Sequence, residues 1–465
     1  MNQDLRSFLK FLQNNYPEYI VRVGKEMSPL LEIPIIQQKL AKENRFPVVY
    51  VEKVQGSKLP LVTNLFGSYE LLGLALGVED PSKVLKEYMR REAKTFPAKK
   101  VSKDQSPVKE KIWTGVDVDL GRLPIVHHAE KDSGKYVVIG CLVCKDPYSG
   151  IPNVGIYRHE VKGKDKLGCM FNPHHHSSYI YHRYQEMSRP MEVAIFIGHH
   201  PAVGIGGSSQ GSLDTHNEYE TMGGLLGEPL ELVDCETVSL EVPAWAEIVI
   251  EGIIEPGNVG TDGPFAEYTG YYGEQKKICM MDVKAITMRK DAIYHDLDPA
   301  HREHNLAGVL PFESHVYRRV YETVPSIIDV YMPPSGCCFF TVYISMKKRV
   351  EGEGRFAGLT ALGCNANLKC AIVVDDDINI HDESEILWAI ATRCEADIDL
   401  TMIPHTLGAH LDPSSYDETR FHKGPMTTKL IIDATKKVNL PFAERIRPAR
   451  GIWEKINLSD YLLPY

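Results

Sequence analysis

The sequence predicts a mixed α/β protein with several domains. Helix-period patterns dominate from Asn2 to about Glu110, which predicts an α/β or mostly α region. From Lys111 to about Ala307, apolar residues recur in short β-branched or alternating runs separated by Gly or Pro, a pattern typical of a β-barrel or sandwich. From Phe339, strand-like and helix-like segments alternate, which predicts a partly parallel sheet covered by helices.

Length and composition limit the possible classes of protein. At 465 residues the chain is too long for one core, and its 43% hydrophobic content is ample for burial. The net charge of −10 disfavours a nucleic-acid partner, because no basic face is evident. No apolar run reaches the roughly 18 residues of a membrane span. Ten cysteines at irregular spacing indicate a reduced, cytoplasmic protein.

The individual elements follow from local patterns. The first twenty residues predict an amphipathic helix, and Asp80 followed by Pro81 predicts a helix start. In the middle region we expect strands at residues 136–144, 191–200, 238–242, 247–254 and 277–288. In the last region we expect strands at 339–346, 369–374 and 397–403 and helices at 355–362 and 383–393. The tail from Asn439 to Tyr465 is expected to contact a neighbouring subunit.

Two carboxylates, Asp262 and Glu267, stand five residues apart on a segment rich in Gly and Pro, Gly263 to Tyr272. Such a pair can move a proton between substrate and protein. Upstream, Arg158 supplies a cation that can hold an anionic substrate and interact with both acids. Together these residues indicate an enzyme.

Other polar motifs are open to more than one interpretation. Asn153, one imidazole of His174 to His176, and Glu218 would make a mixed oxygen and nitrogen site suited to Mn²⁺ or Mg²⁺ more than to Zn²⁺. A histidine triplet in a loop is, however, more often a solvated surface feature, and the pattern alone does not decide. The segment Gly204 to Gly211 can offer backbone N–H groups to a phosphate but lacks the ending of a P-loop, so a flexible loop is favoured.

Two further motifs are interpreted as structural. Cys141 and Cys144 lie in a β-patterned run without a second cysteine pair at zinc spacing, which favours core cysteines. The run Asp375 to Asp377 closes an apolar strand, where carboxylates cap a turn.

Taken together, the motifs resemble the UbiD family of reversible decarboxylases that use prenylated FMN. The matching segments, in family order, are 4–9, 63–68, 153–158, 218–219, 223–228, 263–272, 373–378, 388–389 and 429–435. The resemblance implies an N-terminal α/β domain (1–110), a central split β-barrel that binds flavin (111–307), a C-terminal α/β domain (308–438) and a C-terminal tail (439–465).

The resemblance also implies the chemistry and the partners. The reaction would be reversible, non-oxidative decarboxylation of an aromatic, heteroaromatic or α,β-unsaturated carboxylic acid, through a covalent adduct with prenylated FMN, with CO₂ as the other product. A flavin prenyltransferase would supply the cofactor, and the chain would form a homo-oligomer.

Residue roles are implied in the same way. Asn153, His174 and Glu218 would hold Mn²⁺ (or Mg²⁺) against the cofactor phosphate with K⁺ nearby, although His175 and His176 are close enough to replace His174. The remaining cofactor contacts would come from Ile156, Arg158, Gly207, Ser208 and Lys429. The catalytic residues would be Arg158, Asp262 and Glu267, with Glu267 as general acid. Asp262 stands where the family usually has Glu, so its role stays open.

The substrate and the rival functions are less defined. Polar residues of the stretch 295–306 favour a hydroxylated or otherwise polar acid, or one with a second anionic group. A flavin-binding oxidoreductase is one alternative, but no Gly-x-Gly-x-x-Gly follows a strand. An accessory subunit of a multi-subunit aromatic carboxylase is the other.

Overall fold

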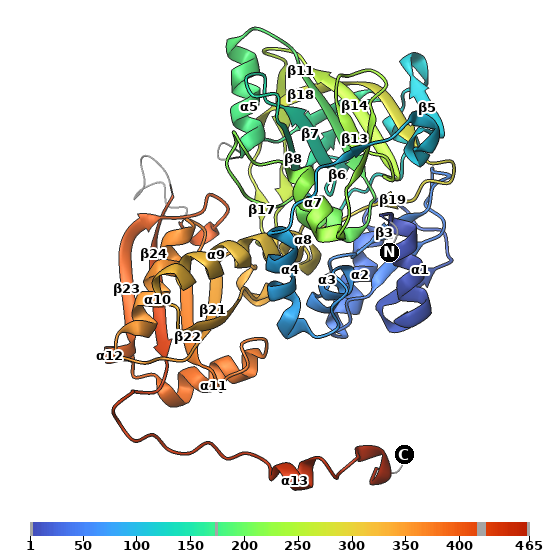
Figure 1. Ribbon diagram of the computed structural model, residues 1–465. Coiled ribbons are helices and arrows are strands. Elements are labelled where there is room, and N and C mark those ends of the chain that lie inside the picture. The colour runs from blue at the N-terminus through green and yellow to red at the C-terminus, as the bar shows by residue number, and fades with distance from the viewer. Residues whose placement is uncertain (1–2, 173–174, 416–424, 463–465) are drawn as a thin grey trace.

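The computed structural model describes residues 3–172, 175–415 and 425–462. Figure 1 shows an N-terminal α/β region, a central β-rich region and a C-terminal α/β region, from which a tail extends. The predicted mixed α/β class is therefore confirmed. Within the described ranges, no helix combines the length and the apolar content that a membrane crossing requires.

The N-terminal region packs helices against a small sheet. Its strands, in order, are β1 (Ile20–Val23), β2 (Val48–Val51), β3 (Leu61–Thr63) and β19 (Tyr294–His295), and its helices are α1 (Leu5–Asn15), α2 (Glu32–Lys42), α3 (Tyr69–Ala75) and α4 (Val84–Glu92). The predicted amphipathic helix is α1, whose N-terminus is capped by Asp4, which accepts the N–H of Ser7 at 2.8 Å. Asp80 caps a 3₁₀ turn that leads into α4, so this predicted helix start is also confirmed.

The central region is built on a large antiparallel sheet around the long strand β18 (Lys276–Met288). Its other strands are β5 (Lys111–Thr114), β6 (Tyr136–Val137), β7 (Cys141–Lys145), β8 (Pro152–Ile156), β9 (His159–Val161), β10 (Lys166–Cys169), β11 (Met191–Ile197), β14 (Ile248–Ile254) and β15 (Val259–Asp262). Residues 136–144, expected as one strand, form β6 and β7, and Cys141 and Cys144 are buried in β7 as core cysteines. The strand expected at 238–242 is displaced to β13 (Glu241–Pro243), which pairs with β12 (Glu231–Asp234) beside β4 (Lys99–Lys100).

The glycine-rich segment 204–211 was expected to be a flexible loop, and for its first residues this is wrong. Gly204 and Gly206 belong to α6 (Pro201–Gly206), which packs against α3 and α7 (Glu218–Leu226). A Cβ at Gly204 would lie 2.8 Å from the Phe66 ring, and one at Gly206 would lie 2.7 Å from Met222. Glycine is therefore required by close packing of helices rather than by a flexible loop.

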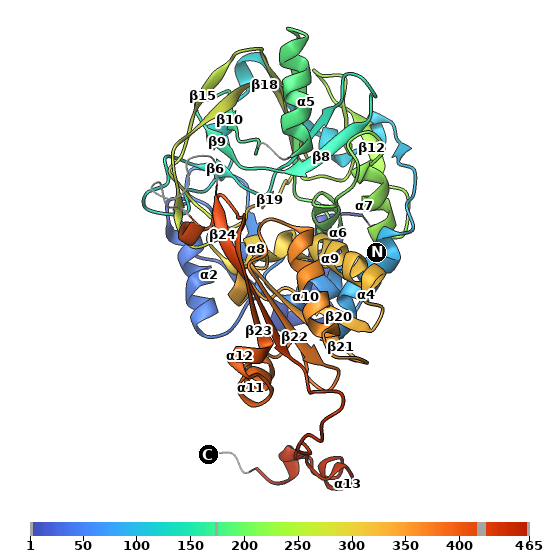
Figure 2. The ribbon, with the colours of Figure 1, turned by 90° about the vertical axis from the view of Figure 1, so that its left-hand side faces the viewer.

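The C-terminal region is a mixed sheet with the order β20 (Ile327–Tyr331), β21 (Thr341–Met346), β22 (Cys370–Asp375), β24 (Met426–Ala434) and β23 (Leu400–Leu407). Figure 2 shows α9 (Val309–Thr323) and α10 (Glu353–Cys364) on one side, with α11 (Glu383–Arg393) and α12 (Ala396–Asp399) toward the other. The predicted alternation is confirmed, except that residues 396–399 form α12 and the strand begins at Leu400. Asp375 and Asp377 pair with Arg393 at 2.7 and 2.8 Å, a structural role.

The tail leaves the C-terminal region across α11. Arg445 pairs with Glu385 at 2.8 Å, and its Cζ atom lies 4.4 Å from the ring centroid of Trp388. Beyond this point the chain extends away from the body and carries α13 (Arg450–Trp453) (Figures 1 and 2). Its apolar side chains are exposed, including Ile446 at 96% and Trp453 at 70%.

Candidate active site

Segments that are distant in the sequence bring Arg158, Asp262 and Glu267 together. Arg158 follows β8, Asp262 ends β15, and Glu267 lies between β16 (Phe265–Ala266) and β17 (Tyr272–Gly273). The Nε and Nη2 atoms of Arg158 donate to Oδ2 of Asp262 at 3.1 and 2.5 Å, and its Nη1 atom donates to Oε1 of Glu267. The structure thus joins the three predicted catalytic residues in one ion-paired group.

This ion-paired group is buried. Asp262 is 0% exposed, Glu267 is 6% exposed, and the Arg158 side chain is 10% exposed. Burial alone would lower the pKa of Arg158, but the two carboxylates raise it above its ordinary value, so the guanidinium stays charged. One guanidinium therefore faces two carboxyl groups.

The loop between the two acids has a conformation that its sequence explains. Gly263 has a φ of +87°, a left-handed conformation that favours glycine, and a Cβ there would lie 3.1 Å from the carbonyl oxygen of Glu274. The ring centroid of Phe265 lies 4.4 Å from the Cζ atom of Arg158. It lies 4.6 Å from the ring centroid of Tyr136. Sequence reasoning missed Tyr136, which stands 127 residues from Gly263 and was visible only as an aromatic residue in a predicted strand.

A second buried polar cluster contains Asn153 of β8 and Glu218, the first residue of α7. The Asn153 side chain donates from Nδ2 to Oε1 of Glu218 at 2.9 Å, and the N–H of Val154 donates to Oε2 at 3.0 Å. Asn153 is 7% and Glu218 2% exposed. Burial raises the pKa of Glu218 from 4.5 to about 7, and no cationic side chain is among the groups that shift it.

The donor set of this cluster fits a divalent cation. Amide and carboxylate oxygens are ligands that Mg²⁺ and Mn²⁺ prefer, and a cation would offset the charge of a buried carboxylate. The third expected ligand, His174, lies outside the described residues, so its place in the site stays a prediction. In the ranges that the structure does describe, no group of three or more His, Cys, Asp or Glu side chains could hold a metal ion. His175 precedes α5 (His176–Glu186), and its ring centroid is 5.5 Å from that of Tyr157.

The other residues expected to contact the cofactor lie on β8, after α6 and in β24. Ile156 ends β8, two residues before Arg158, and Gly207 and Ser208 directly follow α6. Lys429 lies in β24, where its Nζ atom donates to the carbonyl oxygens of Leu362 and Asn365 at 2.9 and 3.0 Å, at the end of α10. The structure therefore does not join Lys429 to Asn153 and Glu218.

Aromatic side chains from the C-terminal region face the residue after Glu267. The ring centroid of Tyr268 lies 5.3 Å from that of Phe339, 6.0 Å from that of Phe340 and 6.0 Å from that of His304. Phe339 also contacts Phe312 at 5.1 Å. Tyr268, the residue after the acid, therefore borders a wall of flat, mostly apolar rings, which the sequence did not indicate because they come from separate elements.

Polar residues of the stretch 295–306, expected as substrate contacts, bond within the protein. Both oxygens of Asp296 lie 3.0 Å from Nε2 of His128. A carboxylate oxygen of Glu303 accepts the N–H of Asn64 at 2.8 Å, and burial raises the pKa of Glu303 to about 8. Internal bonds thus account for Asp296 and Glu303. Buried side-chain atoms of His295, Asp298, His301, Arg302 and Asn305 have no hydrogen-bond partner among the described residues, so the expected polar contacts stay a prediction.

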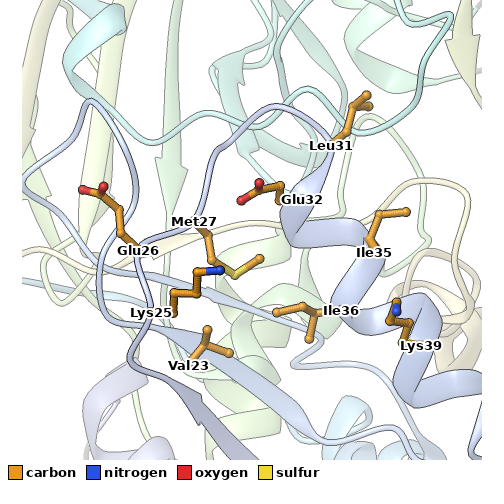
Figure 3. A pocket seen from close by; sticks show the side chains of 9 residues that line it. All are labelled: Val23, Lys25, Glu26, Met27, Leu31, Glu32, Ile35, Ile36 and Lys39. Atoms are coloured by element: carbon orange, nitrogen blue, oxygen red, sulfur yellow. The ribbon is translucent and has the colours of Figure 1, made fainter.

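A groove of about 400 Å³ lies in the N-terminal region, between the end of β1 and α2 (Figure 3). It is lined by Val23, Lys25, Glu26, Met27, Leu31, Glu32, Ile35, Ile36 and Lys39. None of these residues is a candidate for catalysis or cofactor binding, so the groove is not part of the site.

Comparison with known protein families covers most of the chain. Residues 16–92 match the UbiD N-terminal domain, described as the N-terminal domain of 3-octaprenyl-4-hydroxybenzoate carboxy-lyase. Residues 99–301 match its Rift-related domain, and residues 304–434 match its C-terminal domain.

Curated relatives and solved structures agree with these matches. An anhydromevalonate phosphate decarboxylase from Methanosarcina mazei is 33% identical over 93% of this chain and 96% of its own length, and one from Methanothermobacter thermautotrophicus is 32% identical over 85% and 90%. The structure of the UbiD-class enzyme HmfF from Pelotomaculum thermopropionicum in complex with FMN has a TM-score of 0.91 at 38% identity, covering 99% of this chain and 100% of that one. A 3,4-dihydroxybenzoic acid decarboxylase from Enterobacter cloacae has a TM-score of 0.90 at 27% identity, covering 97% and 99%.

These matches run from the N-terminal to the C-terminal domain, in the order of the motifs. They favour a carboxy-lyase over a flavin-dependent oxidoreductase, because the curated relatives are decarboxylases. The chain belongs to the UbiD family of decarboxylases.

Proposed function

We propose that this decarboxylase acts reversibly on an aromatic, heteroaromatic or α,β-unsaturated carboxylic acid, with Arg158 binding the substrate carboxylate and Glu267 acting as general acid. The observation that carries the proposal is the buried guanidinium of Arg158 held between Asp262 and Glu267. Such a group offers both a cation for a carboxylate and a site for a proton.

Glu267 carries the proton in the proposed step. When a substrate carboxylate binds to Arg158, it shares the guanidinium with Asp262 and Glu267, which brings the substrate beside the acid. Glu267 then gives its proton to the carbon that loses CO₂. In the carboxylating direction, Glu267 takes the proton back. Asp262 keeps Arg158 oriented throughout.

Cofactor requirements follow from the chemistry and from the structural neighbours. Loss of CO₂ from an unsaturated carbon leaves an electron pair that side chains cannot accept, and prenylated FMN supplies the electron sink when bound. HmfF structures contain FMN or prenylated FMN. Asn153, Glu218 and His174 would hold Mn²⁺ or Mg²⁺ near the cofactor phosphate, with K⁺ nearby and Ile156, Gly207, Ser208 and Lys429 as further contacts. A flavin prenyltransferase would supply the cofactor.

The substrate class rests on the aromatic wall and on the relatives. Flat rings around Tyr268 favour a planar, conjugated acid. The curated relatives act on anhydromevalonate phosphate, so an aromatic ring is not required of the substrate. An acyclic unsaturated acid, with or without a phosphate group, therefore stands beside aromatic acids.

The assembly and the compartment are also proposed. Exposed apolar residues of the tail would be covered by a second copy of the chain, and one HmfF structure with a TM-score of 0.88 is a dimeric form. All ten cysteines are free thiols, which supports a reducing, cytoplasmic location.

The test begins with protein co-produced with a flavin prenyltransferase. Its absorbance spectrum and the mass of the bound cofactor are measured first. Deuterium exchange into decarboxylated products is then followed in D₂O with bicarbonate, for aromatic, heteroaromatic and acyclic unsaturated candidates. A prenylated FMN mass with exchange on one product supports the proposal. Bound cofactor without exchange or turnover on any candidate contradicts it and favours an accessory subunit of a larger carboxylase.

A further inference from the structure

The backbone on either side of the acid loop is held by one other segment, residues 129–136, which no motif indicated. The N–H of Gly263, next to Asp262, donates to the Tyr136 hydroxyl at 3.2 Å. The N–H of Ala266, next to Glu267, donates to Oδ1 of Asp132 at 2.8 Å. Each of the two acids is therefore adjacent to a peptide group that the 129–136 segment holds.

Further bonds join the same two segments. The N–H of Ser133 donates to the carbonyl oxygen of Pro264 at 3.0 Å, and the N–H of Lys131 donates to the Tyr272 hydroxyl at 3.3 Å. The Ser133 hydroxyl lies 2.7 Å from the Tyr136 hydroxyl. The acid loop is thus attached to the 129–136 segment at its start, its middle and its end.

Asp132 and Tyr136 are buried side chains whose orientations are fixed by their own contacts. Asp132 is 6% exposed, and its second oxygen accepts the N–H of Ala129 at 3.0 Å, which fixes the carboxylate within its own segment. Tyr136 is 0% exposed, and its ring packs on Phe265. Neither side chain forms a hydrogen bond with Arg158, Asp262 or Glu267 among the described residues, so their hydrogen bonds reach the acids through the backbone.

We propose that Asp132 and Tyr136 are positioning residues, which set the place of Asp262 and Glu267 by holding the N–H groups of Gly263 and Ala266. The proposal rests on the acid role proposed for Glu267. Proton transfer depends steeply on geometry, because a displacement of about 1 Å can cost about 100-fold in rate. The proton donor Glu267 lies on the loop itself, whereas Arg158 lies on another segment and is joined to the loop only through its ion pairs. Loosening the loop therefore affects the proton-transfer step more than substrate binding.

Two variants test the proposal. Asp132→Asn keeps the shape but turns one acceptor oxygen into an NH₂ donor, and Tyr136→Phe removes only the hydroxyl. Matched controls are Asp119→Asn, since Asp119 also accepts a backbone N–H, from Gly121 at 2.9 Å, and Tyr88→Phe, since Tyr88 is a buried tyrosine that donates to Glu92 at 3.0 Å.

The first measurement is amide hydrogen exchange, by mass spectrometry, of the peptide that covers residues 259–273 in the holoenzyme. We expect faster exchange of this peptide in both variants, with the other peptides and both controls unchanged. Wild-type protection of the peptide in both variants would overturn the proposal. This readout needs no substrate, so it decides the anchoring role even if the proposed function fails.

The second measurement is the kinetics of deuterium exchange into product. We expect kcat to fall at least about 10-fold in Asp132→Asn and about threefold or more in Tyr136→Phe, with KM changed less than about twofold. Equal losses in the controls, or wild-type kcat in both variants, would overturn the positioning role. Glu267→Gln is measured beside them: if it keeps wild-type exchange, the proposed function fails, whereas the amide exchange result stands.

Discussion

Arg158 gives two of its hydrogen bonds to a single oxygen of Asp262. Nε and Nη2 of Arg158 lie 3.1 and 2.5 Å from Oδ2, while the other oxygen, Oδ1, is buried and has no hydrogen-bond partner within the described ranges. An ionised carboxylate accepts bonds at both oxygens, and a buried one without a partner is costly. Asp262 therefore holds Arg158 through one oxygen, while its second oxygen is a buried acceptor without a partner among the described residues.

Replacement of Asp262 by Asn should lower kcat by about 10- to 100-fold, because one of the two charges that orient Arg158 is lost. The measurement is kcat for deuterium exchange beside the wild type. Wild-type kcat in Asp262→Asn would exclude Asp262 from the proton-transfer step.

Replacement of Glu267 by Gln should reduce turnover by at least about 100-fold while the flavin stays bound, because the amide cannot donate a proton to carbon yet keeps the shape of the side chain. Turnover and the bound flavin, by absorbance and mass, are measured together. Glu255→Gln is the control, since Glu255 is exposed. Full activity of Glu267→Gln would remove this residue from the mechanism.

Removal of the divalent cation should release the flavin. Chelator-treated protein should lose Mn²⁺ and flavin together, and Mn²⁺ should restore flavin binding. The variant Glu218→Gln lacks the buried carboxylate, so added Mn²⁺ should not restore flavin binding in this variant. Metal content by plasma emission and flavin retention after gel filtration provide the measurements. Retention of flavin by metal-free wild-type protein would contradict a metal role for Asn153 and Glu218.

Stability should decrease as the pH rises, partly because of Glu313. This carboxyl accepts the N–H of Met332 at 2.7 Å and a bond from the hydroxyl of Tyr69, and burial raises its pKa from 4.5 to about 8. Between these values the folded state keeps a proton that the unfolded state releases. The free energy of unfolding should therefore fall by about 1.4 kcal/mol per pH unit from this group, until pH passes 8.

The variant Glu313→Gln removes this titration, so its free energy of unfolding should change less steeply with pH. Urea unfolding at pH 6, 7, 8 and 9 measures the slope, and Glu322→Gln, whose side chain is 62% exposed, serves as the control. A slope equal to that of the wild type would show that Glu313 is ionised in the folded protein.

Truncation after Val438 should lower the oligomer mass in solution, measured by light scattering, because the exposed apolar side chains of the tail are then lost. Trp453→Ala should weaken the assembly in the same direction, whereas Val116→Ala, at a residue 87% exposed outside the tail, should not. A truncated chain with the mass of the full-length oligomer would place the contact elsewhere.

Local sequence patterns were sufficient to predict the elements that depend on residues close together in the chain. Asp4 and Asp80 mark helix starts by the side-chain bonds that cap them. The alternation after residue 339 reflects central strands that are buried almost throughout and helices that cover the sheet. The motif containing Glu267 includes Gly263, whose φ of +87° explains why glycine stands there.

Contacts between distant segments could not be read in this way. Asp132 and Tyr136 lie in an ordinary polar-to-apolar stretch, and only the folded chain brings them to Ala266 and Gly263. The glycines of α6 were mistaken for loop residues because the reason for them is a close approach of Phe66 and Met222. The bonds from Lys429 to the end of α10 likewise depend on how β24 and α10 pack.

The position of β19 has a consequence for synthesis on the ribosome. Tyr294 and His295 pair in parallel with Leu61 and Val62, so the first sheet of the chain stays one strand short until residue 295 has emerged. Until then β3 presents an open edge, which is able to pair with other nascent chains. The N-terminal region can therefore complete its fold only after almost the whole central region has been made, and fragments that end before residue 294 should be prone to aggregation.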